Sequence, residues 1–159
     1  MKLVIATSNK GKLAEMLPIL QEAGIEGIPQ SHFGFPDAEE TGCTFVENAL
    51  LKARNACQQS GLPALADDSG IIIDALNGAP GLISAHYAGV HGDAAGNIAK
   101  VLAEMTALQS PVRTARFYCC MVLLAHADDP QPIIAEGIWR GDILPAPLGE
   151  HGFGYDPIF

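Results

Sequence analysis

Two lysines stand where a short apolar segment changes to helical spacing, within residues 7–12 (TSNKGK). Asn9 is a residue type that begins helices, and the unpaired N–H groups of a helix's first turn attract phosphate oxygens. Gly11 lets a ligand approach the backbone, and Lys10 or Lys12 supplies a mobile positive charge. The segment predicts a phosphate site that is neither a P-loop nor a dinucleotide loop, because the glycine spacing of both is missing. On this segment alone, a capped helix with surface lysines is the simpler interpretation.

Two pairs of carboxylates, Glu39-Glu40 and Asp67-Asp68, stand far apart in the sequence, each beside glycine or small polar residues. Mg²⁺ is usually bound by one or two carboxylates together with substrate phosphates and water, so this number of acids is sufficient. A carboxylate could alternatively act as the general base on an attacking water molecule. The glutamates, taken singly, fit a solvated acidic loop. The aspartates stand between apolar runs, where an unpaired carboxylate is unfavourable, and this favours a functional role for Asp68.

The glycine-rich stretch from Gly152 to Pro157 presents two aromatic residues, Phe153 and Tyr155, on a flexible backbone. Such a segment suits a site that stacks a planar base and hydrogen-bonds the edge of that base through main-chain groups. A Gly-Pro turn whose aromatic side chains belong to the core explains the same stretch equally well. The stretch alone therefore leaves both interpretations open.

The segments that carry these residues alternate between strand and helix patterns. The polar residues 67–70 separate two apolar runs, so Asp67 and Asp68 are expected at strand ends. The turn at 128–130 predicts an antiparallel hairpin after the strand-helix units of the first half. The expected fold is a single α/β domain over residues 1–159, with a mixed parallel and antiparallel sheet flanked by helices. Strands are predicted at 3–6, 25–29, 64–66, 71–73, 114–127 and 132–143, and helices at 10–24, 44–61 and 93–108.

The charge balance limits the classes of partner. The 159 residues include 18 Asp and Glu against 9 Lys and Arg, a formal net charge of -9, so no overall field attracts nucleic acid or an anionic membrane. The sequence has no signal segment and no apolar stretch of membrane-spanning length. The cysteines and histidines lack metal-ligand spacing, and the cysteines are interpreted as buried thiols in a reducing compartment. We expect a cytoplasmic protein with no nucleic-acid or membrane partner, which binds anionic ligands through local charges.

Five motifs, in this order, closely resemble the inosine triphosphate pyrophosphatase family: TSNKGKL, EETGCTFVENALLKA, ADDSG, GAPGLISAHYAG and GFGYDPIF. Any one of them could arise by chance, whereas five in the family's order and approximate spacing make a specific signal over residues 1–159. The resemblance implies an enzyme that hydrolyses noncanonical purine nucleoside triphosphates, namely ITP, dITP or XTP, between the α- and β-phosphates. It implies the release of the nucleoside monophosphate and pyrophosphate, a requirement for Mg²⁺, and assembly as a homodimer.

The resemblance also implies roles for the residues that match the family's motifs. Asp68 matches the catalytic carboxylate, which is also a metal ligand, and either Glu39 or Glu40 matches the second metal-associated acid. A pocket that prefers 6-keto purines over adenine would place hydrogen-bond donors opposite O6. The residues that match substrate contacts are Thr7, Ser8, Asn9, Lys10, Gly11 and Lys12 at the triphosphate, with Lys52 and Ser69, and Phe153, Gly154, Tyr155 and Asp156 at the base.

Two departures from the family pattern limit these expectations. His86 stands in SAHYAG where the family commonly has arginine or lysine, so a positive charge there depends on protonation of the imidazole. The family continues past GYDPIF with segments that contact base and phosphate, so we interpret the chain as C-terminally truncated. The alternative function is therefore a noncatalytic nucleotide-binding or dimerisation fragment. A pyrophosphatase for pyrimidine or modified triphosphates is a further alternative, which changes the substrate and keeps the chemistry.

Overall fold

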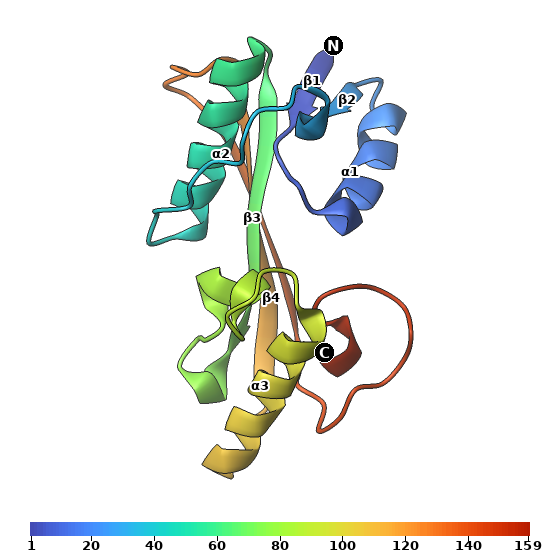
Figure 1. The fold of residues 1–159 in the computed structure, drawn as a ribbon, viewed down its shortest axis with the longest axis vertical. Coiled ribbons are helices and arrows are strands. Elements are labelled where there is room, and N and C mark those ends of the chain that lie inside the picture. The colour runs from blue at the N-terminus through green and yellow to red at the C-terminus, as the bar shows by residue number, and fades with distance from the viewer. The chain divides into compact units, whose positions relative to one another are not determined.

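The computed structural model describes all of residues 1–159 and divides into two compact units. The first unit consists of Met1–Asp68 and Cys120–Glu136, and the second of Ser69–Cys119 and Gly137–Phe159. Three strands contribute residues to both units, and the single domain remains a prediction. The elements, drawn in Figure 1, are β1 (Lys2–Ile5), α1 (Lys10–Glu22), β2 (Glu26–Pro29), η1 (Gln30–His32), α2 (Phe45–Ser60), β3 (Ala64–Ile73), η2 (Asp74–Leu76), η3 (Gly81–His86), α3 (Ala94–Leu108), β4 (Thr114–Leu124), β5 (Ile133–Asp142) and η4 (Asp156–Ile158).

The strands form a five-stranded sheet in the order β2-β1-β3-β4-β5. β1 is parallel to both of its neighbours, and it pairs with β3 through Val4 opposite Ala64 and Ile5 opposite Leu65. β4 and β5 are adjacent and are joined by residues 125–132, a connection shorter than the crossover of about a dozen or more residues that parallel strands need. This last pair is therefore antiparallel, and the predicted mixed sheet is confirmed.

The helices of the first unit begin where their capping residues predict. Asn9 accepts the N–H of Lys12 at 3.1 Å on its side-chain oxygen and begins α1. Thr44 begins α2 in the same way, and Gly61 ends it with a positive φ of 70°. Within this unit α1 lies beside β1 and β2, and α2 runs beside the first part of β3 (Figure 1). Both helices thus start next to the strands that carry the predicted site.

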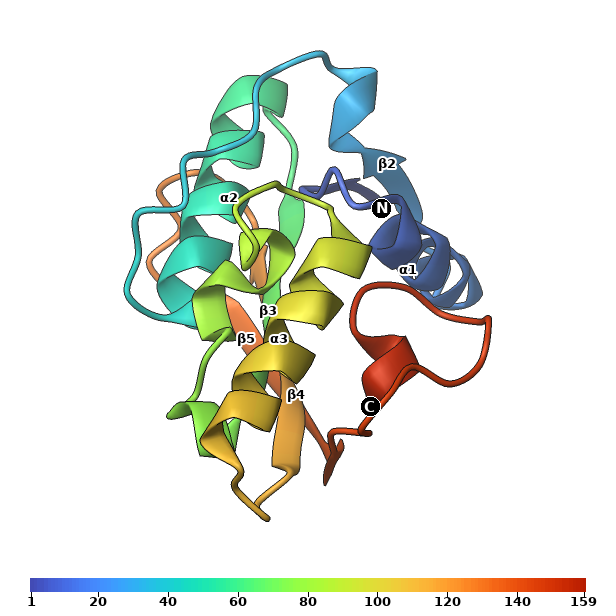
Figure 2. The ribbon, with the colours of Figure 1, turned by 60° about the horizontal axis from the view of Figure 1, so that its bottom comes forward.

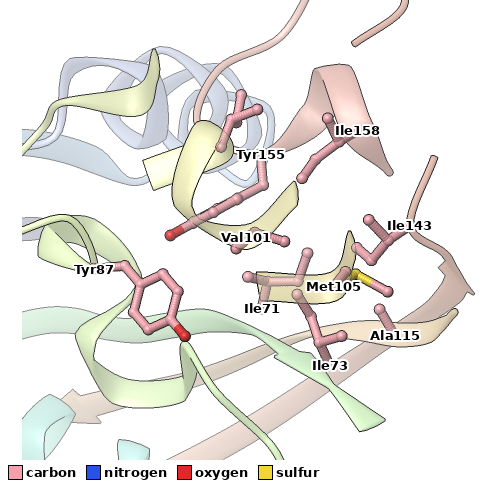
Figure 3. Packing of buried hydrophobic residues seen from close by; sticks show 10 residues of the cluster. Ile71, Ile73, Tyr87, Val101, Met105, Ala115, Ile143, Tyr155 and Ile158 are labelled. Atoms are coloured by element: carbon pink, nitrogen blue, oxygen red, sulfur yellow. The ribbon is translucent and has the colours of Figure 1, made fainter. Parts of the chain in front are cut away.

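The second unit has its own apolar core (Figure 3). α3 begins after Asp93, whose carboxylate accepts the N–H of Gly96 at 3.0 Å. The loop after β5 leads to η4 at the end of the chain (Figure 2), where Tyr155 enters the core and donates its hydroxyl to the carbonyl of Ser84 at 2.7 Å. The core residues are Ile71, Ile73, Tyr87, Ile98, Val101, Met105, Ala115, Ile143, Tyr155 and Ile158.

One expectation about the sheet was wrong. Residues 67–70 do not separate two strands, because β3 runs without a break from Ala64 to Ile73. The aspartates are buried inside the strand and are bonded to lysine and asparagine side chains from other elements, so their polarity does not end it. Gly70 allows a close approach of backbones, since a Cβ there would lie 2.3 Å from the carbonyl oxygen of Gly81. None of the helices combines the length and apolar character needed to cross a membrane.

Candidate active site

The carboxyl end of β1 places the predicted phosphate-binding segment next to the two aspartates. β1 ends at Ile5, which is opposite Leu65, and the N–H of Ala6 donates to the carbonyl of Leu65 at 2.8 Å. β3 continues past this point, so Asp67 and Asp68 lie beside the turn that leads into α1. Ligand sites of α/β proteins commonly lie at the carboxyl ends of parallel strands. The topology therefore brings two of the predicted constellations together within the first unit.

Asp68 is 5% exposed, and each of its carboxylate oxygens accepts a hydrogen bond from α2. Nζ of Lys52 donates to Oδ1 at 3.2 Å, and Nδ2 of Asn48 donates to Oδ2 at 3.3 Å. Lys52 also donates to Oε1 of Glu40 at 3.1 Å. Asn48 and Lys52 are four residues apart, which places both on one face of the helix. One ammonium group thus lies between the carboxylates of Asp68 and Glu40.

Asp67 is bonded to a different lysine. Its Oδ2 accepts from Nζ of Lys12 at 2.6 Å, and its side chain is only 2% exposed. Successive side chains of a strand point to opposite faces, so Lys12 and Lys52 approach β3 from opposite sides. Figure 1 agrees, since α1 and α2 flank the first part of β3. Each buried aspartate therefore has its own cation.

The turn before α1 is held by polar side chains. Oγ1 of Thr7 accepts the N–H of Asn9 at 3.2 Å, and the hydroxyl of Ser8 donates to the carboxylate of Asp37 at 2.7 Å. The buried amide of Gln30 donates to Ser8 at 3.0 Å and also to Asp37. The hydroxyl of Ser8 is therefore engaged with Asp37. Lys10 and Gly11 follow at the start of α1, where Lys10 is exposed to solvent.

Burial and charge shift the ionisation of the central groups. Burial raises the pKa of Asp68 above its usual value, and the negative charge of Glu40 adds to this rise. The positive charge of Lys52 lowers this pKa, and so do the hydrogen bonds from Lys52 and Asn48. Burial alone would lower the pKa of Lys52, but the charges of Asp68, Glu40 and Asp67 raise it above its usual value. Lys52 therefore stays protonated at neutral pH, and the shift of Asp68 suits a group that accepts a proton.

The acids near Lys52 suit a divalent cation that also binds phosphate. No group of three or more histidine, cysteine, aspartate or glutamate side chains is arranged to hold a metal by itself. Asp68 and Glu40, however, already face one cationic nitrogen, and two carboxylates are sufficient for Mg²⁺ when phosphates and water complete its ligands. Glu39 is exposed and takes no part in these contacts. Of the two predicted glutamates, Glu40 is the one that lies next to Asp68.

The residues predicted to bind the base belong to the second unit. They form a turn in which the carboxylate of Asp156 accepts the N–H of Phe153 at 2.9 Å and Gly154 has a positive φ of 60°. Phe153 is 41% exposed, whereas Tyr155 is 5% exposed and bonded within the core. Ser69 is the first residue of the same unit. The substrate contacts predicted for these residues stay predictions.

Comparison with known proteins identifies the family. The model of the Ham1 family matches residues 3–159. The chain belongs to the Ham1 family. It is 58% identical over 159 residues to a protein of Thioalkalivibrio sulfidiphilus named dITP/XTP pyrophosphatase, covering all of this chain and 81% of that relative. It is 53% identical over 158 residues to the Vibrio cholerae protein of the same name, covering 99% of this chain and 79% of that relative.

Solved structures of Ham1 proteins have the same fold. The structure of a HAM1 protein from Coxiella burnetii superposes with a TM-score of 0.93 at 51% identity, covering 100% of this chain and 81% of that one. The Staphylococcus aureus Ham1 protein gives a TM-score of 0.86 at 38% identity, covering 100% and 80%. The α/β fold with a mixed sheet and flanking helices is therefore shown by neighbours of clear sequence similarity as well as by this chain's own strand order.

The structure brings into the candidate site residues to which the sequence had assigned no specific role. Asp67 and Asn48 each contact a predicted site residue, and both carried a signal, because Asp67 precedes Asp68 and Asn48 is one helical turn before Lys52. Gln30 and Asp37 had no such signal. Their contact with Ser8 joins segments that are distant in sequence, and no spacing rule indicates it.

Proposed function

We propose that this chain hydrolyses noncanonical purine nucleoside triphosphates, ITP, dITP and XTP, to the nucleoside monophosphate and pyrophosphate. The observation that carries the proposal is the buried carboxylate of Asp68, which shares the ammonium of Lys52 with Glu40. The preceding residue of the strand, Asp67, is bonded to Lys12 in the first turn of α1. The relatives of this chain at 58% and 53% identity are named dITP/XTP pyrophosphatase. The site and the names of the relatives thus indicate the same reaction.

In the proposed reaction the side chains position a water molecule and the triphosphate. The water oxygen forms a bond to the α-phosphorus while the bond from that phosphorus to the α–β bridging oxygen breaks. Pyrophosphate leaves, and a proton of the water passes to the carboxylate of Asp68. The N–H groups at the start of α1 and the ammonium groups of Lys12 and Lys52 stabilise negative charge on the phosphates.

We propose Mg²⁺ as the cofactor, held by Asp68 and Glu40 together with phosphate oxygens and water. When bound, Mg²⁺ would neutralise part of the phosphate charge and orient the substrate. The residues of the chain fit this role because the two carboxylates already lie on either side of one cationic nitrogen. Lys52 has a flexible stem and is free to exchange its carboxylate partners for phosphate oxygens.

For the base, we propose that Phe153 stacks on the purine and that main-chain groups of residues 153–156 hydrogen-bond its edge. Phe153 is partly exposed, and the turn is held by Asp156. Donors that face O6 of inosine or xanthine would face the amino group of adenine, leaving two donors opposed. This arrangement predicts discrimination against ATP.

The test is pyrophosphate release from ITP, dITP and XTP, with ATP, GTP and dUTP as comparisons, with and without Mg²⁺. Asp68→Asn removes the proposed base, and Asp74→Asn is a matched control because Asp74 is a surface aspartate bonded to Arg116 and Thr114. We expect Mg²⁺-dependent, ITP-selective turnover that Asp68→Asn lowers by about 10²–10⁴-fold and Asp74→Asn leaves unchanged. Binding of ITP without pyrophosphate release would instead support the nucleotide-binding fragment, and turnover of dUTP would move the substrate class to pyrimidines.

We also propose that the protein is a homodimer and that it is cytoplasmic. Edge strand β5 leaves Ile138 and Trp139 exposed, and antiparallel pairing of two β5 strands centred on Ile138 would place Glu136 of each copy opposite Arg140 of the other. Sedimentation equilibrium tests this, with a monomer for Ile138→Glu as the expected result; a wild-type monomer would contradict it. The cytoplasmic location is supported by four cysteines, none of which forms a disulfide, and fractionation of the source cells tests it.

A further inference from the structure

Asn48 connects two parts of the site that are distant in sequence. It lies in the first turn of α2 and is 2% exposed. Its Oδ1 accepts the N–H of Gly42 at 2.8 Å, and its Nδ2 donates to Oδ2 of Asp68 at 3.3 Å. A single uncharged amide therefore joins the loop that carries Glu40 to the strand that carries Asp68.

The loop at Gly42 packs closely against the start of α2. A Cβ on Gly42 would lie 2.7 Å from Oδ1 of Asn48 and 2.6 Å from Cβ of Glu47, so only glycine fits without displacement. The carboxylate of Glu47 accepts the N–H of Cys43 at 2.9 Å, which holds the next residue of the loop to the same turn. Glu40 stands two residues before Gly42. The hydrogen bond from the N–H of Gly42 to Asn48 therefore restrains the position of Glu40.

Asn48 and Lys52 restrain the same carboxylate in different ways. Each donates to one oxygen of Asp68, but Lys52 is charged and also contacts Glu40. A triphosphate with its cation competes for the ammonium of Lys52 and for the acids around it. Asn48 has no net charge and is buried, so nothing in that exchange draws its amide away.

We infer that Asn48 is a positioning residue that sets the spacing between the carboxylates of Asp68 and Glu40 while Lys52 exchanges partners. The inference rests on the proposed function of these two acids as cation ligands. Side chains that hydrogen-bond to metal ligands typically contribute about 10–100-fold to metal affinity. Loss of the Asn48 amide therefore weakens cation binding although no ligand is removed.

The chain offers a matched control in Asn97. This residue is 3% exposed and lies in the first turn of α3 in the second unit. Its Oδ1 accepts the N–H of Ala88 at 2.7 Å, and its Nδ2 donates to the carbonyls of Ser84 and Ala85 at 3.3 Å. Asn48→Ala and Asn97→Ala thus each remove a buried amide that bonds both a backbone donor and an acceptor, and only the first contacts the site.

The experiment measures binding of Mn²⁺, as a paramagnetic substitute for Mg²⁺, to the full 159-residue chain by electron paramagnetic resonance without nucleotide. Urea denaturation of each variant reports its stability, and the Mg²⁺ concentration for half-maximal ITP turnover is a second readout. We expect Asn48→Ala to weaken Mn²⁺ binding by about 10–100-fold and to raise the Mg²⁺ requirement, while Asn97→Ala loses similar stability and binds Mn²⁺ like the wild type.

Equal Mn²⁺ affinity in the two variants, or no Mn²⁺ binding by the wild type, would overturn the inference. Failure of the proposed function is a separate outcome, because it is seen as absence of ITP turnover in the wild type. A chain that binds Mn²⁺ through Asn48-positioned acids but hydrolyses no nucleotide would uphold the inference and reject the enzyme.

Discussion

Nζ of Lys12 lies 2.6 Å from Oδ2 of Asp67, a carboxylate whose side chain is 2% exposed. A buried carboxylate without a partner is strongly unfavourable, so this contact supports the fold as well as the local charge. The lysine also lies in the first turn of α1, where N–H groups are available to phosphate oxygens. In a chain with a formal net charge of -9, Lys12 thus has a structural role, and the phosphate-binding role proposed for it falls at the same position.

Lys12→Met should reduce both stability and triphosphate binding, because it leaves Asp67 buried without its cation. We expect the free energy of unfolding to fall by about 1–3 kcal/mol, measured by urea denaturation. Calorimetry with a nonhydrolysable ITP analogue should show weaker binding. Lys10→Met is the control, since Lys10 is exposed two residues earlier and should leave stability unchanged. Equal stability of the two variants would contradict the role of the Lys12–Asp67 pair.

Glu40→Gln and Glu39→Gln should differ in their Mg²⁺ requirement, because only Glu40 shares the ammonium of Lys52 with Asp68. Removing the charge of Glu40 takes away one of the two proposed carboxylate ligands. We expect a higher Mg²⁺ concentration for half-maximal pyrophosphate release in Glu40→Gln and a wild-type value in Glu39→Gln. The reverse order would assign the metal role to Glu39.

The stability of the second unit should fall at alkaline pH because of Tyr87. Burial raises the pKa of this phenol to about 12, and the hydrogen bond to Glu104 and the charge of Glu104 act in the same direction. Since the pKa is raised on folding, the contribution is fully present below the unfolded value of about 10 and is lost as the pH rises through about 12. Urea midpoints across this range should fall less steeply in Tyr87→Phe. Parallel pH profiles would show that another group causes the loss.

Features set by neighbouring residues were predictable from the sequence. Asn9, Thr44 and Asp93 each begin a helix as their types indicate, because a cap bonds an N–H only a few residues away. The order of strands and helices was predictable for the same reason. Apolar runs and helical spacing are local patterns, and the mixed sheet followed from their sequence.

Features set by distant partners were not predictable in the same way. The polar residues 67–70 indicated a break in β3, yet the strand continues because Lys12 and Lys52, far away in the sequence, compensate its buried aspartates. The choice between Glu39 and Glu40 likewise depends on which side chain reaches Lys52 in three dimensions. Composition and spacing contain no information about contacts between residues that are distant in the sequence. The motifs therefore indicated the segments of the candidate site, and the structure was needed to show which side chains contact one another.

Substitutions of Phe153 and Tyr155 should have different effects. The first should weaken binding of the base, and the second should lower the stability of the fold. Phe153 is 41% exposed and available to a base, whereas Tyr155 is 5% exposed and donates to the carbonyl of Ser84 at 2.7 Å. Stacking of a base on an aromatic ring contributes about 1–3 kcal/mol, so Phe153→Ala should raise the Kd for ITP substantially with little change in stability. Tyr155→Phe keeps the ring and main chain and should instead lower the free energy of unfolding by about 1 kcal/mol. Calorimetry with the nonhydrolysable ITP analogue and urea denaturation on both variants provide the comparison, and wild-type affinity in Phe153→Ala would exclude stacking on this ring.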